Sequence, residues 1–136
     1  MRFTLAVLLF LLAACVPAQV PPQLSFTPGP PITITENTVE TAQFIVRYPR
    51  GWRVVKLSIA GAPPWLAFIS DDDTLRIEVR AQPFDDDVAP LLEDIVQMDS
   101  THIYLRGMSE SNDTDTLQPY FDLVRESLDI HEATNQ

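Results

Sequence analysis

The chain has 136 residues, with 9 Lys and Arg against 19 Asp and Glu and a formal net charge of −10. This length holds one ordinary domain, which excludes a multi-domain enzyme, a repeat array and a polytopic membrane protein. Because so acidic a chain repels phosphate backbones, nucleic acid is not expected as a partner. Cys15 is the single cysteine, so an intrachain disulfide and a zinc ribbon are also excluded.

Residues 1–14 have the pattern of an export signal. Arg2 supplies one positive charge, and the following stretch to Ala14 is apolar except for Thr4. At helical rise this stretch covers about 18 Å, which is too short for a bilayer core of about 30 Å. It ends in Leu-Ala-Ala-Cys15, which closely resembles the lipobox of bacterial lipoproteins. The resemblance implies that the Cys15 thiol carries a diacylglycerol and that the chain is cut just before it.

This resemblance also implies a location, the extracytoplasmic face of the bacterial cell envelope. The membrane is then a partner through the lipid anchor. Two acyl chains supply the stable anchoring that one cannot. Two alternatives remain open. The small residues at 16–18 can form an ordinary cleavage site that yields a soluble secreted protein, or residues 5–12 can be a buried core segment.

A proline-rich stretch follows the cysteine. Residues 16–31 hold six of the twelve prolines, which favours extended, polyproline-like backbone. We therefore interpret residues 15–31 as a lipidated cysteine with a tether. Residues 32–130 then form a single domain, and residues 131–136 a tail.

The first half of this domain has the alternation of β-strands. Short strands are expected at residues 32–35, 42–48 and 52–59, with a turn around Asn37. Residues 65–81 predict a β-hairpin, because polar residues separate two apolar runs. In its second strand, Leu75, Ile77 and Val79 are expected to face inward, and the other set of side chains to form a paired, solvated surface. The outward set is Arg76, Glu78 and Arg80.

The second half has helical spacing. A helix is expected over residues 87–98, with Asp87 as N-cap. Its buried stripe would be Leu91, Leu92, Ile95 and Met98. Residues 101–108 favour a strand slightly. A last helix, capped by Asp115 or Thr116, would bury one stripe of side chains. That stripe is Leu117, Phe121, Val124 and Leu128. The order predicts an α+β fold, an antiparallel sheet packed against helices.

Residues 44–52 read FIVRYPRGW, a strand that ends in Tyr-Pro, then a small turn and Gly-Trp. This pattern, with the hairpin and the closing helix, resembles the PsbP/Mog1-like superfamily. The resemblance implies a sandwich that acts as an accessory or interaction domain, and no shared catalytic motif carries over. A functional interpretation places Tyr48, Trp52 and Trp65 beside a groove, while a turn with core aromatics is the favoured one.

Two acidic runs are the weak metal candidates. Asp71, Asp72 and Asp73 lie in the hairpin turn, and Asp85, Asp86 and Asp87 precede the first expected helix. Six carboxylates brought together would suit Ca²⁺, but neither run has the spacing of a calcium loop. A solvated turn and a charged helix N-terminus are the favoured readings, so no metal site is predicted.

The chain carries no recognisable catalytic motif. No H-E-x-x-H, G-x-S-x-G or phosphate-binding loop is present, and the two histidines, His102 and His131, are 29 residues apart. No catalytic residue and no cofactor is therefore predicted. The expected function is a non-catalytic binding or accessory module on a membrane-anchored envelope lipoprotein, with an envelope protein or a small ligand as partner. The alternatives are a Ca²⁺-dependent binding domain and a small secreted hydrolase.

Overall fold

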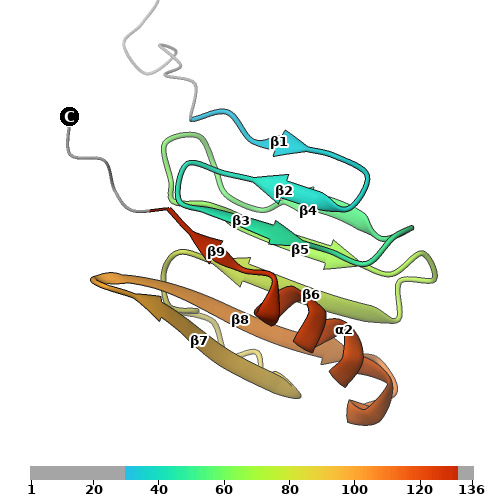
Figure 1. Ribbon diagram of the computed structural model, residues 1–136. Helices are drawn as coiled ribbons and strands as arrows, with labels where there is room; N and C mark the ends of the chain where they lie inside the picture. The colour runs from blue at the N-terminus through green and yellow to red at the C-terminus, as the bar shows by residue number, and fades with distance from the viewer. Residues whose placement is uncertain (1–29, 132–136) are drawn as a thin grey trace, which may run out of the picture.

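Nine strands and one helix make up residues 30–131, the part of the chain that the computed structural model describes (Figure 1). The strands are β1 (Thr33–Ile34), β2 (Thr38–Glu40), β3 (Phe44–Arg47), β4 (Arg53–Lys56), β5 (Trp65–Ile69), β6 (Leu75–Arg80), β7 (Leu92–Met98), β8 (Thr101–Ser109) and β9 (Asp129–Ile130), and the helix is α2 (Thr114–Glu126). The expected signal peptide, Cys15 and most of the tether lie outside the described residues, as does the tail from residue 132.

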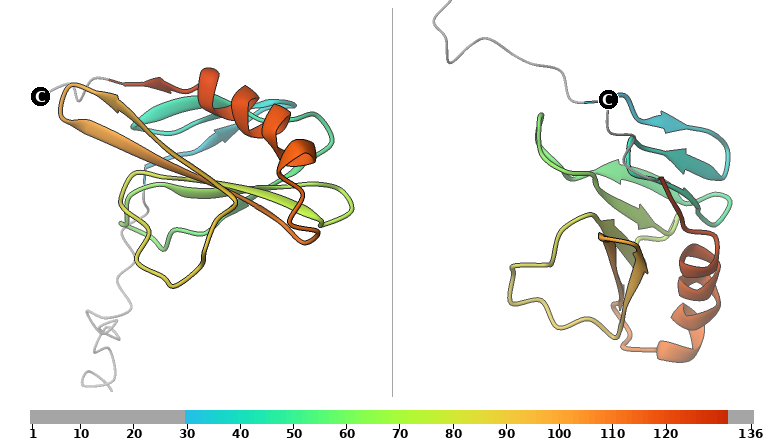
Figure 2. Two further views of the ribbon diagram at one scale, coloured as in Figure 1. Left: turned by 90° about the horizontal axis from the view of Figure 1, so that it is seen from below. Right: turned by 60° about the vertical axis from the view of Figure 1, so that its left-hand side comes forward.

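The strands form two antiparallel sheets. One has the order β1-β2-β3-β9 and the other the order β4-β5-β6-β8-β7. Helix α2 lies beside β9 in the layer of the four-stranded sheet and packs on β8 and β7 (Figures 1 and 2). The fold is thus a two-layer sandwich, with the five-stranded sheet as one layer and the smaller sheet plus α2 as the other.

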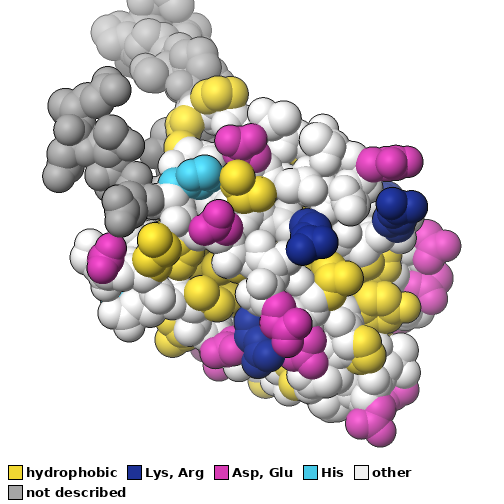
Figure 3. Space-filling view, in the orientation of Figure 1, with side chains coloured by type: hydrophobic (Ala, Val, Ile, Leu, Met, Phe, Trp, Pro, Cys, Tyr) yellow, Lys and Arg dark blue, Asp and Glu magenta, His cyan; other side chains and the backbone are white. Residues whose placement is uncertain are grey.

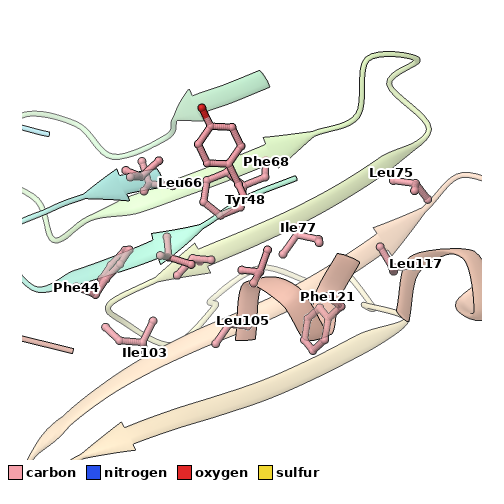
Figure 4. Close-up of a cluster of buried hydrophobic side chains, with 14 of the residues drawn as sticks. Phe44, Tyr48, Leu66, Phe68, Leu75, Ile77, Ile103, Leu105, Leu117 and Phe121 are labelled. Carbon is pink, nitrogen blue, oxygen red and sulfur yellow. The ribbon is translucent and has the colours of Figure 1, made fainter. Parts of the chain in front are cut away.

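The core lies between these layers (Figure 4). Successive side chains of a strand point to opposite faces, so every second residue reaches the core. β6 shows this plainly, since Leu75, Ile77 and Val79 are buried on its inner face. Residues from six elements meet there, and each is at most 2 % exposed. They are Val39, Phe44, Val46, Leu66, Phe68, Ile77, Val79, Ile103, Leu105, Leu117, Phe121 and Val124.

The structure confirms the elements with the strongest local patterns. The hairpin of residues 65–81 forms as β5 and β6, and residues 101–108 lie in β8. Helix α2 buries three of the four predicted stripe residues, while Leu128 follows the helix and is partly buried. The N-cap is Asp113 rather than Asp115 or Thr116, because the Asp113 carboxylate accepts hydrogen bonds from both of their backbone N–H groups.

The predicted helix over residues 87–98 is wrong. These residues form a loop and then β7, which pairs with β8 from Leu92↔Gly107 to Met98↔Thr101. Two turn residues join the strands, and Asp99 takes the left-handed backbone conformation, with φ of 51°. Asp87 therefore caps no helix. The fold class is a mixed α+β sandwich with one helix among the described residues. Within those residues, no helix is long and apolar enough to cross a membrane.

Two short strands were not predicted. β2 lies where a turn was expected and pairs with both β1 and β3. β9 follows α2 and pairs with β3 through Phe44↔Ile130 and Ile45↔Asp129. His131, expected in a free tail, continues this ladder, since its backbone N–H donates to the carbonyl of Gln43 over 2.8 Å. The end of the described chain is therefore attached to the four-stranded sheet.

Candidate functional site

The structure does not bring the three aromatic candidates to one groove. Tyr48 is buried in the core, stacks on Phe68 with ring centroids 5.3 Å apart, and donates its hydroxyl hydrogen to the carbonyl of Thr35. Trp52 packs on the ring of Tyr120 in α2, at 5.0 Å. Trp65 lies on the other face of the five-stranded sheet. The next residue of β5, Leu66, is buried in the core, and successive side chains of a strand point to opposite faces.

The first acidic run serves the turn between β5 and β6. The Asp72 carboxylate accepts hydrogen bonds from the Ser70 hydroxyl and from the backbone and side chain of Thr74. These bonds favour the charged form, and the pKa of Asp72 is lowered, chiefly by the Ser70 hydroxyl. Asp73 forms an ion pair with Arg53 of β4. This run therefore closes a hairpin turn.

The second acidic run holds the loop after β6 against the outer face of the five-stranded sheet. Asp85 pairs with Arg80 at 2.7 Å, and Asp86 makes a two-point contact with the guanidinium of Arg106, at 2.5 and 2.8 Å. Within residues 30–131, no three His, Cys, Asp or Glu side chains are grouped so that they could hold a metal ion. The bonded carboxylates of the two runs thus have separate partners, which are arginines, hydroxyls and backbone N–H groups.

A buried ionic network lies beneath this loop. Glu78, 1 % exposed, accepts hydrogen bonds from Arg106 Nε and from the indole N–H of Trp65, both at 3.0 Å, and pairs with Arg76. Phe84 of the loop lies 4.1 Å from the guanidinium carbon of Arg106, in cation–π geometry. The outer side of β6, expected to be solvated, is therefore covered where Glu78 lies.

This network predicts a dependence of stability on pH. Hydrogen bonds from Arg106 lower the pKa of Asp86 from 3.8 to about 2. A carboxyl whose folded-state pKa is lowered stabilises the fold above its unfolded pKa, and this contribution is lost as pH falls through the folded pKa. We expect Asp86→Asn to destabilise the protein at neutral pH, with the deficit shrinking between about pH 4 and pH 2. Urea unfolding at a series of pH values measures it.

The matched control is Asp87→Asn, because Asp87 makes no ion pair among the described residues. This variant should keep the wild-type profile of stability against pH. An Asp86→Asn deficit that stays constant from pH 7 to pH 2 would show that the Asp86 charge does not stabilise the loop.

A separate pocket of about 330 Å³ lies at the end of the sandwich where β6 stops and β8 continues. Imidazole, phenol, hydroxyl and amide groups line it, together with small apolar residues. The lining residues are Ala42, Gln43, Ala81, Pro83, Ser100, Thr101, His102, Tyr104 and His131. Its size falls in the range of small-ligand sites. We call it the histidine pocket, since both histidines of the chain line it.

The histidine pocket differs chemically from the rest of this acidic molecule. No lining residue carries a carboxylate, a guanidinium or an ammonium group. The His102 and Tyr104 rings lie 6.5 Å apart at 29°, and the buried Nε2 of His131 has no hydrogen-bond partner among residues 30–131. Such a lining offers hydrogen-bond donors and acceptors to a polar ligand. Figure 3 shows a histidine (cyan) near the left end of one face, with acidic side chains (magenta) beside it.

Sequence reasoning missed this pocket. His102 is the second residue of β8 and His131 follows β9, and the pairing of β9 with β3 brings His131 to the lining. No local spacing signals such a contact, because it depends on strand pairing between segments far apart in the chain. None of Tyr48, Trp52 and Trp65 lines the pocket.

Comparison with known proteins found no matching family model, no similar curated protein and no similar solved structure.

Proposed function

We propose that this protein is a lipid-anchored lipoprotein of the bacterial cell envelope, and that its domain is a PsbP/Mog1-like binding or accessory module. The observation that carries the binding role is the histidine pocket, a concave site with convergent polar groups and no charged side chain in its lining. The envelope anchor is supported by the sequence that ends in Cys15.

The placement of the FIVRYPRGW stretch supports the family proposal. Its first four residues form β3, Gly51 has a positive φ of 81° in the turn, and Trp52 packs against the core. Positive φ is a conformation that glycine adopts without a steric penalty. The antiparallel sandwich with a closing helix is the architecture that this resemblance implies.

The position of the pocket fits an anchored binding module. Pro30 and Ile32, where the described chain begins, line a small crevice together with Ala42, and Ala42 also lines the histidine pocket. The ligand site thus lies at the end of the domain that the tether enters. Fourteen residues lie between Cys15 and Pro30, and in the polyproline-like backbone that their composition favours, the fifteen steps from Cys15 to Pro30 would span about 45 Å. The pocket could then reach partners close to the membrane surface.

The anchor is tested by producing the full-length chain in a bacterium grown with radiolabelled palmitate. Wild-type protein should carry the label and sediment with membranes until detergent is added, because two acyl chains give stable membrane binding. Cys15→Ser should carry no label. It should be recovered either as soluble protein or as the uncleaved chain.

Ala18→Ser, a small change three residues beyond the cysteine, should behave as wild type in this assay. Label that survives Cys15→Ser, or wild-type protein that stays soluble, would refute the anchor.

A further inference from the structure

An open strand edge borders the histidine pocket. β8 runs from Thr101 to Ser109, but β6 pairs with it only as far as Arg80↔Tyr104. Within the described part of the chain, no strand therefore lies opposite the first three residues of β8 on this side. We call the place where β6 has ended and β8 continues the step. The pocket lies at this step, since Ala81 and the beginning of β8 both line it.

The hydrogen-bond pattern shows which main-chain groups face the step. The N–H of Glu110 donates to the carbonyl of Thr74, which makes Leu75↔Ser109 a non-hydrogen-bonded pair of the β6–β8 ladder. Pairs alternate along an antiparallel ladder, so the even-numbered residues of β8 point their N–H and C=O toward β6. His102 is the next of these beyond the end of β6. Its backbone donor and acceptor hence point into the open step.

The turn between β7 and β8 gives the same result independently. Two residues connect Met98↔Thr101, so this flanking pair is hydrogen-bonded and Gln97↔His102 is not. The backbone of His102 is therefore turned away from β7. By contrast, the outer edge of β7 is partly closed by its own side chain, because the Asp94 carboxylate accepts a hydrogen bond from the N–H of Ile95 at 2.8 Å.

The charge around the step selects the partner. The chain carries a net charge of −10, and two exposed carboxylates adjoin lining residues: Asp99 precedes Ser100, and Asp129 lies two residues before His131. The lining itself offers only neutral hydrogen-bonding groups and imidazoles. A neutral backbone in the pocket, with positive side chains at the rim, matches this distribution.

We propose that the histidine pocket binds an extended peptide segment with basic side chains, which adds to the β8 edge as a short strand in the place where β6 has ended. This inference rests on the proposed function, since it names the partner chemistry of the same pocket. The peptide backbone accepts from the N–H of His102 and donates to its C=O, as in other cases of strand addition.

Three synthetic peptides test the proposal on the full-length protein in detergent. They are Ac-Lys-Val-Thr-Val-Lys-NH₂, its Glu-Val-Thr-Val-Glu counterpart, and the basic peptide N-methylated at its three central residues. The imidazole NMR signals report on the pocket, because the chain has two histidines and both line it. The basic peptide should shift both sets of signals. Its affinity should exceed that of the acidic peptide about tenfold at low salt. This ratio should become smaller at high salt, because salt screens the charges.

The N-methylated peptide keeps the charges but lacks the central N–H donors, and it should bind at least about fivefold more weakly. Ala42→Trp fills the pocket from an exposed position and should abolish the shifts, whereas Ala60→Trp, exposed and outside the pocket lining, should not. Equal binding of the N-methylated peptide, binding that survives Ala42→Trp, or no binding at millimolar peptide would each overturn the proposal. The anchor of the proposed function is tested separately. It stands if Cys15→Ser releases the protein from membranes, whatever the result with the peptides.

Discussion

Replacing Arg106 by Met is expected to lower the free energy of unfolding by about 3–5 kcal/mol. Arg106 is almost fully buried and bonds both Glu78 and Asp86. Removing one partner of a buried ion pair leaves the other charge without compensation, which costs much more than the intact pair contributes. In this variant Glu78 keeps only Arg76 and the indole N–H of Trp65. Urea unfolding at pH 7 measures the loss.

The matched control is Arg76→Met. Arg76 also pairs with Glu78, but its side chain is 40 % exposed, so the loss should be about 1 kcal/mol or less. A second variant separates charge from packing. Glu78→Gln in the Arg106→Met background removes the buried charge that has lost Arg106 and should recover part of the stability. If Arg106→Met costs no more than Arg76→Met, the buried network does not hold the loop.

The sequence predicted those elements whose periodicity and burial coincide locally. In β6, alternation placed Leu75, Ile77 and Val79 on one face, and this face is the core. In α2, spacings of three and four placed Leu117, Phe121 and Val124 on one side, where they are buried. In both cases one element by itself determines which of its faces is apolar, so no distant partner has to be known.

The failed helix has a physical reason. In the predicted stripe only Leu91 and Leu92 are partly buried, whereas Ile95 and Met98 are 52 % and 39 % exposed. The side chain that packs inward with Leu92 is Val96, four residues further, and this spacing fits one face of a strand as well as one face of a helix. Pairing with β8 determines the conformation, and this strand comes later in the chain. Local periodicity cannot reveal such a contact.

Glu78 shows a second limit. Alternation correctly assigned it to the outer face of the hairpin, but outer does not mean solvated here. The loop that follows β6 folds back over this face and brings Phe84 and Asp86 onto Arg106. Sequence reasoning placed Asp86 at a helix N-terminus, so it could not foresee the cover. The histidine pocket was missed for the same kind of reason, since its lining is assembled by strand pairing.

Replacing Phe121 by Ala is expected to lower the free energy of unfolding by about 3–5 kcal/mol. The side chain is 2 % exposed and packs from α2 onto the sheet (Figure 4). Truncating a buried Phe loses its transfer free energy and leaves a cavity that the surroundings fill only in part. Leu123→Ala, on the same helix at a position 43 % exposed, should change the stability by about 0.5 kcal/mol or less. Urea unfolding of both variants at pH 7 measures the difference.

A glycine in β8 makes the Phe121 prediction sharper. A Cβ at Gly107 would lie 3.0 Å from both Leu117 Cδ2 and Phe121 Cδ2, so α2 approaches this strand as closely as only glycine allows. Gly107→Ala alone should therefore cost about 1–3 kcal/mol through overpacking. In the Phe121→Ala background the added methyl group has room, and the same change should cost less, because residues in contact do not contribute additively. Full additivity of the two losses would show that Phe121 does not set the distance between α2 and β8.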